Sequence, residues 1–62
     1  MFEVNNVDDA WELGVLHADG LIPVEVVAFE RANLIEAFDD GVRDHKNLNP
    51  SRVAEFASGW LV

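Results

Sequence analysis

The chain has 62 residues, half of them hydrophobic, with a formal net charge of −8 and no cysteine. It is too apolar for a disordered chain and too short for two domains, and the missing cysteine excludes disulfides and thiolate metal sites. Two histidines, His17 and His45, are too few for a structural zinc site, so we expect no metal ion and no cofactor. A chain this short then depends on self-association, as a homodimer, or on folding against a partner.

The first ten residues, MFEVNNVDDA, contain neither the basic region nor the apolar run of a signal peptide. No stretch approaches the roughly 18 apolar residues that are needed to span a bilayer. We therefore expect a cytoplasmic protein that makes no use of a membrane.

The first helix is expected from about Val7 to Ala18. Asn6 is a suitable N-cap, and Asp8 and Asp9 follow in the first turn, where carboxylates favour the positive end of the helix dipole. Gly20 can adopt the left-handed conformation that ends a helix. The expected apolar face of this helix consists of Val7, Trp11, Gly14, Val15 and Ala18.

The second helix is expected to begin at Pro23, because a first helical residue needs no N–H, and to run to about His45. Segment 24–29 is rich in β-branched residues, but the proline before it and the helical pattern after it favour helix over strand. Gly41 costs about 1 kcal/mol relative to alanine in a helix interior. We still expect the helix to continue through it, with Gly14 and Gly41 allowing neighbouring helices to cross closely. The expected apolar stripe consists of Val24, Val27, Ala28, Leu34, Ile35, Phe38 and Val42.

The third helix is expected to begin at Pro50, with Asn49 as its N-cap, and to continue to Trp60 or the chain end. Its expected apolar face consists of Val53, Phe56, Ala57 and Trp60. Arg31 falls inside the apolar stripe of the second helix. There it either extends to the edge of that face or pairs with an acidic residue of the first helix.

An internal repeat becomes visible when the sequence is shifted by 27 residues, without a gap. Repeat one covers about residues 8–34 and repeat two about residues 35–62, with the common pattern A-[WF]-x-x-G-V-x5-L-x-P-x-x-V-x-x-F. The identical pairs are Ala10/Ala37, Gly14/Gly41, Val15/Val42, Leu21/Leu48, Pro23/Pro50, Val26/Val53, Phe29/Phe56 and Leu34/Leu61. The pattern predicts an all-α, three-helix single domain over residues 1–62. Its two helix–loop–helix repeats would share a long central helix.

The sequence contains few candidate catalytic residues. Ser51 and Ser58 are the hydroxyl candidates for nucleophilic catalysis, and no nucleophile-elbow motif surrounds either of them. Asp8 and Glu12 are four residues apart on one helix face, a spacing at which a metal or a proton could be shared. Acid–base catalysis also needs a cleft that shifts pKa values, and a chain of this length seldom builds one. We expect a protein that is not an enzyme.

The stretch AFDDGVRDHKNLNPSRVAEFASGW, residues 37–60, resembles the ribosome modulation factor family, which also places A-x-x-x-G before a proline and ends in G-W. The resemblance covers less than half of the chain. The proline-to-tryptophan spacing is shorter than in that family, and the strongly basic character of the family is missing. The resemblance therefore implies no binding of ribosomal RNA.

The negative charge is concentrated in the first half of the chain. Residues 1–30 contain seven acidic residues and no Lys or Arg, whereas residues 31–62 contain five acidic and four basic residues. Such a field repels phosphate backbones and anionic membrane surfaces. The acidic residues either form a solubilising surface or make a patch that attracts a basic partner.

These observations favour a protein–protein interaction module, an inhibitor or adaptor of the kind found among phage accessory proteins, that docks on a basic or mixed protein surface. The predicted partner-binding residues are Asp8, Asp9, Trp11, Glu12, Asp19, Trp60 and Leu61. One alternative is a nucleic-acid mimic that blocks a DNA- or RNA-binding enzyme. A further alternative is a helix-turn-helix DNA-binding regulator, whose recognition helix would carry Arg52 as its only basic residue.

Overall fold

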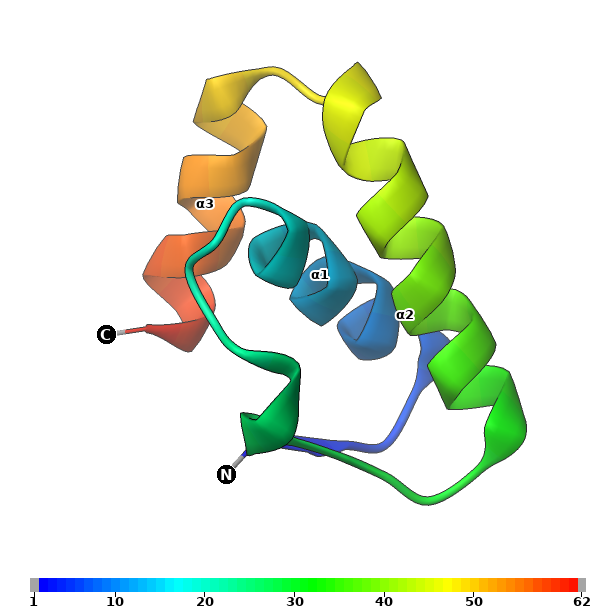
Figure 1. Ribbon diagram of the computed structural model, residues 1–62. Coiled ribbons are helices and arrows are strands. Elements are labelled where there is room, and N and C mark those ends of the chain that lie inside the picture. The colour runs from blue at the N-terminus through cyan, green and yellow to red at the C-terminus, as the bar shows by residue number, and fades with distance from the viewer. Residues whose placement is uncertain (1, 62) are drawn as a thin grey trace.

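The computed structural model describes residues 2–61, and most of this range is helical (Figure 1). The helices are α1 (Val7–Ala18), α2 (Ala32–Asp44) and α3 (Pro50–Trp60). The chain also contains two short strands, β1 (Phe2–Val4) and β2 (Val27–Phe29). It further contains two 3₁₀ turns, η1 (Val24–Val26) and η2 (His45–Asn47). Met1 and Val62, the ends of the predicted domain, lie outside the described residues. The mostly helical, three-helix prediction is confirmed, and the strands are an addition to it.

Helix α1 begins and ends as the sequence predicts. The side-chain oxygen of Asn6 accepts a hydrogen bond from the Asp9 amide at 2.9 Å, which caps the first turn. At the other end Gly20 has a φ of 80°, the left-handed conformation that glycine adopts without strain. The amides of Gly20 and Leu21 bond back to the carbonyls of His17 and Leu16, each at 3.0 Å, and so close the helix in a Schellman motif.

The predicted long helix from Pro23 to His45 is wrong in its first third. Pro23 is extended, and the chain then forms η1 and β2 before α2 begins at Ala32. Strand β2 pairs in parallel with β1, with Phe2 opposite Val27 and Val4 opposite Phe29. Residues 27–29 of the β-branched segment thus form a strand, because a partner strand lies on the other side of α1 in the sequence. A parallel pair needs such a crossover connection, and α1 provides it.

Arg31 stands just before α2, with extended backbone and no capping side chain. The contacts within ion-pair distance in residues 2–61 are Arg43–Asp40 and His45–Asp19, so the alternative in which Arg31 pairs with an acidic residue of α1 is wrong. The apolar stripe that was predicted for the second helix is only partly buried. Leu34 and Phe38 are buried, whereas Val24, Ile35 and Val42 are exposed. No helix in the described range is long and apolar enough to cross a membrane.

Helices α1 and α2 cross in close contact at two glycines. A Cβ atom on Gly14 would collide with the carbonyl oxygen of Phe38, and one on Gly41 would collide with the carbonyl oxygen of Trp11. The prediction that both glycines permit a close crossing is therefore confirmed, and α2 does run through Gly41 without a break. The two contacts are equivalent under the 27-residue offset. The duplication itself stays a prediction, because segment 24–29 and its counterpart in α3 have different structures.

The hydrophobic core lies around α1, which occupies the centre of the fold with α2 on one side and α3 on the other (Figure 1). The buried apolar side chains are Val4, Ala10, Leu13, Val15, Leu16, Ile22, Val27, Leu34, Phe38 and Val53. Helix α3 contributes Val53 to this set, and Phe56, Ala57 and Trp60 are half-buried against it. As predicted, Pro50 is the first residue of α3 and Asn49 caps it, accepting from the Arg52 amide at 3.1 Å.

Candidate partner-binding surface

Two pockets flank the line along which α3 meets α1. We call the first the acidic–aromatic pocket; it has a volume of about 270 Å³ and is lined by Asp8, Trp11, Glu12, Arg52 and Phe56. Three of these residues come from α1 and two from α3. Asp8 and Glu12 lie four residues apart and Trp11 three residues from Asp8, so all three share one face of α1. Arg52 and Phe56 share one face of α3 for the same reason.

The aromatic wall of the acidic–aromatic pocket is held by contacts to all three helices. The rings of Trp11 and Phe56 meet edge to face, with centroids 5.6 Å apart and an interplanar angle of 81°. The indole nitrogen of Trp11 donates a hydrogen bond to the Asp44 carboxylate in α2 at 2.9 Å. The Arg52 guanidinium carbon lies 5.8 Å from the centroid of the Phe56 ring, within the range of a cation–π contact. The indole of Trp11 is therefore held in one orientation by contacts within the chain.

The carboxylates of this pocket have no partner within the described residues. Neither Asp8 nor Glu12 forms a side-chain hydrogen bond or an ion pair in the range 2–61. Arg52 lines the same pocket but is not within ion-pair distance of either carboxylate. Two negative charges and one positive charge thus border the pocket, so it retains an excess of negative charge.

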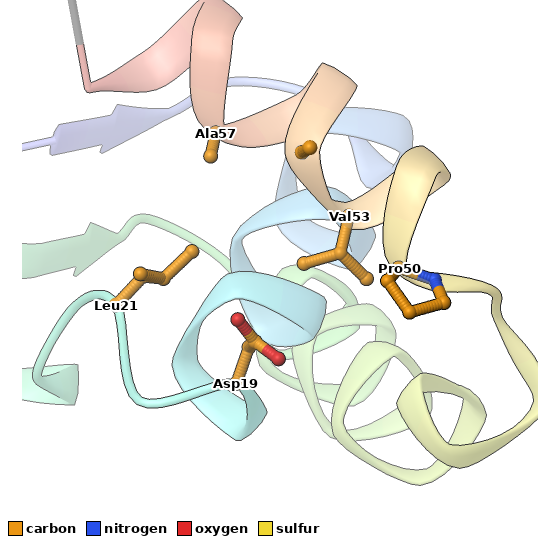
Figure 2. A pocket seen from close by; sticks show the side chains of 6 residues that line it. Asp19, Leu21, Pro50, Val53 and Ala57 are labelled. Atoms are coloured by element: carbon orange, nitrogen blue, oxygen red, sulfur yellow. The ribbon is translucent and has the colours of Figure 1, made fainter.

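We call the second pocket the apolar pocket; it has a volume of about 310 Å³. Its lining residues are Asp19, Leu21, Pro50, Val53, Ala54 and Ala57. Figure 2 shows Asp19 and Leu21, from the segment after α1, facing Pro50, Val53 and Ala57 of α3. A carboxylate oxygen of Asp19 lies 2.8 Å from the Nε2 atom of His45, which ties the end of α1 to η2. Asp19 therefore already makes a contact that holds two elements of the fold together.

The predicted binding residues do not gather at a single place. Asp8, Trp11 and Glu12 meet in the acidic–aromatic pocket, and Asp19 lies at the apolar pocket. Asp9 instead accepts a hydrogen bond from the Asn6 side chain at 3.1 Å, in addition to the amide bond that caps α1.

The two predicted residues at the end of α3 line neither pocket. The Trp60 ring packs edge to face on Phe2, with centroids 5.7 Å apart, and is half-buried. Leu61 is exposed. Trp60 therefore helps to hold α3 against the strand β1 and stands apart from the acidic residues of α1.

Arg52 and Phe56 were missed as members of the site. Their spacing places them on one side of the third helix, and this much is visible in the sequence. Phe56 belongs to the predicted apolar face, so the sequence suggests a core residue there. The sequence does not reveal which side of α3 borders α1. No group of three metal-ligating side chains is present in the part of the chain that the structure describes.

Comparison with known proteins adds no relative from which a function could be carried over. No protein-family model matches the chain, and no curated protein and no solved structure matches it. The resemblance of residues 37–60 to ribosome modulation factors therefore supports no family assignment. The function has to be argued from the surface itself.

Proposed function

We propose that the protein is a small binding module, an inhibitor or adaptor, that docks onto a basic or mixed protein surface through α1 and α3. The observation that carries the proposal is the acidic–aromatic pocket. It places the carboxylates of Asp8 and Glu12, which have no ion-pair partner within residues 2–61, beside the fixed rings of Trp11 and Phe56.

Aromatic side chains support this proposal because they supply large contact areas and are enriched among the residues that dominate binding energies. The hydrogen bond from the Trp11 indole to Asp44 supports it further. A side chain that is already held in place loses little conformational entropy when a partner covers it.

The charge of the chain supports the same kind of partner. Seven acidic residues and no basic ones in residues 1–30 create a negative field that accelerates the approach of a positively charged protein surface. The apolar pocket on the other side of α3 adds contact area for apolar side chains of that partner. Together the two pockets give α3 a bindable surface on each side.

Affinity capture tests the proposal. The tagged chain, residues 1–62, is incubated with an extract of its source cells, and bound proteins are quantified by mass spectrometry. The variant combines Asp8→Asn with Glu12→Gln, and the matched control combines Glu36→Gln with Asp39→Asn, two exposed acidic residues of α2. Both variants lose two negative charges, and circular dichroism verifies that both are folded.

We expect a protein that is captured by the wild-type chain and by the α2 control but not by the pocket variant. Equal loss in both variants would show that net charge alone attracts the protein. Capture that survives the pocket variant would place the binding surface elsewhere and contradict the proposal.

A further inference from the structure

We infer that the acidic–aromatic pocket receives an arginine side chain of the protein partner, a deepening that rests on the proposed function. Three properties of the pocket lead to this occupant: its excess negative charge, its aromatic walls and the position of Arg52.

The charge of the pocket calls for a cation. Asp8 and Glu12 bring two carboxylate groups to the pocket, and within the described residues no cation lies within ion-pair distance of either. A guanidinium can donate parallel hydrogen bonds to a carboxylate, which is stronger and more specific than a contact between neutral groups. The two carboxylates stand one helical turn apart, so a planar group with several donors can reach both.

The aromatic walls favour a cation that is flat and weakly hydrated. Tryptophan provides the most favourable ring for a cation–π contact, and the pocket contains Trp11 next to Phe56. Guanidinium groups stack on aromatic rings more often than ammonium groups do, because they lose less hydration. The pocket thus distinguishes arginine from lysine by the shape and hydration of the charged group.

Arg52 shows that this wall accepts a guanidinium. Its guanidinium carbon lies 5.8 Å from the centre of the Phe56 ring, and its side chain lines the same pocket. Arg52 is therefore an intramolecular competitor of the incoming side chain: it occupies one aromatic ring, and its charge opposes a second cation. Removing the charge of Arg52 should strengthen the binding of a cation and weaken the binding of an anion. The sign of this effect identifies the class of ligand.

The test is an NMR titration of the ¹⁵N-labelled full chain with the tripeptide acetyl-Gly-Arg-Gly-amide. The chain has two tryptophans, and the indole N–H signals of Trp11 and Trp60 report on the pocket and on an internal control. Trp60 packs on Phe2 and lines neither pocket, so its signal should stay in place. The companion titrations use the citrulline tripeptide, which is neutral and nearly isosteric, the lysine tripeptide, and inorganic phosphate.

We expect the arginine tripeptide to shift the Trp11 indole signal with a dissociation constant of roughly 1 mM, which corresponds to about 4 kcal/mol of binding free energy. The citrulline tripeptide and phosphate should leave the signal unchanged, and the lysine tripeptide should bind more weakly. Combining Asp8→Asn with Glu12→Gln should weaken binding of the arginine tripeptide about tenfold, because each exposed ion pair contributes up to about 1 kcal/mol. Arg52→Gln should strengthen it about threefold.

Equal shifts by the arginine and citrulline tripeptides would overturn the inference, because the guanidinium charge would then be irrelevant. A shift by phosphate that Arg52→Gln abolishes would overturn it as well and would identify an anion site. In either case a protein captured through Asp8 and Glu12 would leave the proposed docking function standing. If instead no captured protein depended on Asp8 and Glu12 while the arginine titration was as expected, the proposed function alone would be contradicted. The wild-type comparison of arginine with citrulline needs no variant to fold.

Discussion

The crossing of α1 and α2 leads to a prediction about stability at Gly14 and Gly41. A Cβ at either position would meet the backbone carbonyl of a residue in the other helix, Phe38 or Trp11. A backbone carbonyl cannot rotate away as a side chain can, so the helices themselves must move apart. Gly59, near the end of α3, serves as the matched control, because a Cβ atom added there would have no atom within 4 Å.

The magnitude follows from two opposing effects. Overpacking costs typically 1–3 kcal/mol, and a clash with backbone belongs at about 3 kcal/mol. Replacing glycine by alanine in a helix gains about 1 kcal/mol of helix propensity. Gly14→Ala and Gly41→Ala should each lower the free energy of unfolding by about 2 kcal/mol. Gly59→Ala meets no clash and should raise it by up to about 1 kcal/mol.

Thermal unfolding followed by circular dichroism measures these differences. For a domain of this size, 1 kcal/mol corresponds to about 4–8 °C in Tm, so each crossing variant should melt about 8–16 °C lower than the wild-type chain. Gly59→Ala should melt at the wild-type temperature or above it. If Gly14→Ala or Gly41→Ala were as stable as Gly59→Ala, the close crossing of α1 and α2 would be wrong.

Two further predictions concern the cap of α1 and the assembly of the chain. Asn6→Ala removes the acceptor of the Asp9 amide and should lower the free energy of unfolding by about 1 kcal/mol in urea titrations. The control Asn5→Ala changes the neighbouring residue and should have little effect. Equal effects of the two substitutions would show that the cap adds nothing to stability. A chain of 62 residues buries only about 60% of the surface that its unfolded form exposes. We therefore expect the purified protein to sediment as a homodimer at micromolar concentration. A monomer mass at all concentrations would contradict this expectation.

The limits of α1 and the start of α3 could be predicted because their signals are local. Asn6 and Gly20 mark the ends of α1, and Asn49 with Pro50 marks the start of α3, all within a few residues of the helix they limit. The strands could not be predicted in this way. Phe2 and Val27 pair across a separation that contains the whole of α1, and each strand has only three residues. No alternation of that length stands out from its surroundings.

The part of the candidate site that depends on local helical spacing could also be predicted from the sequence. Helical spacing brings Asp8, Trp11 and Glu12 to one face of α1, and the structure finds them together in one pocket. The contribution of Arg52 depends on how α3 is rotated about its own axis, which is a property of tertiary packing. Asp9 was selected for its charge, but it is hydrogen-bonded within the first turn of α1.

We propose that the protein binds its partner through the acidic–aromatic pocket. The most direct measurement is the dissociation constant of the captured partner, obtained by calorimetry for three proteins: the wild-type chain, Asp8→Asn with Glu12→Gln, and Glu36→Gln with Asp39→Asn. Interface ion pairs that become desolvated contribute more than exposed ones, so the pocket variant should bind at least about tenfold more weakly than the wild-type chain. The α2 variant should bind within about twofold of it. Identical affinities of the two variants would contradict the account.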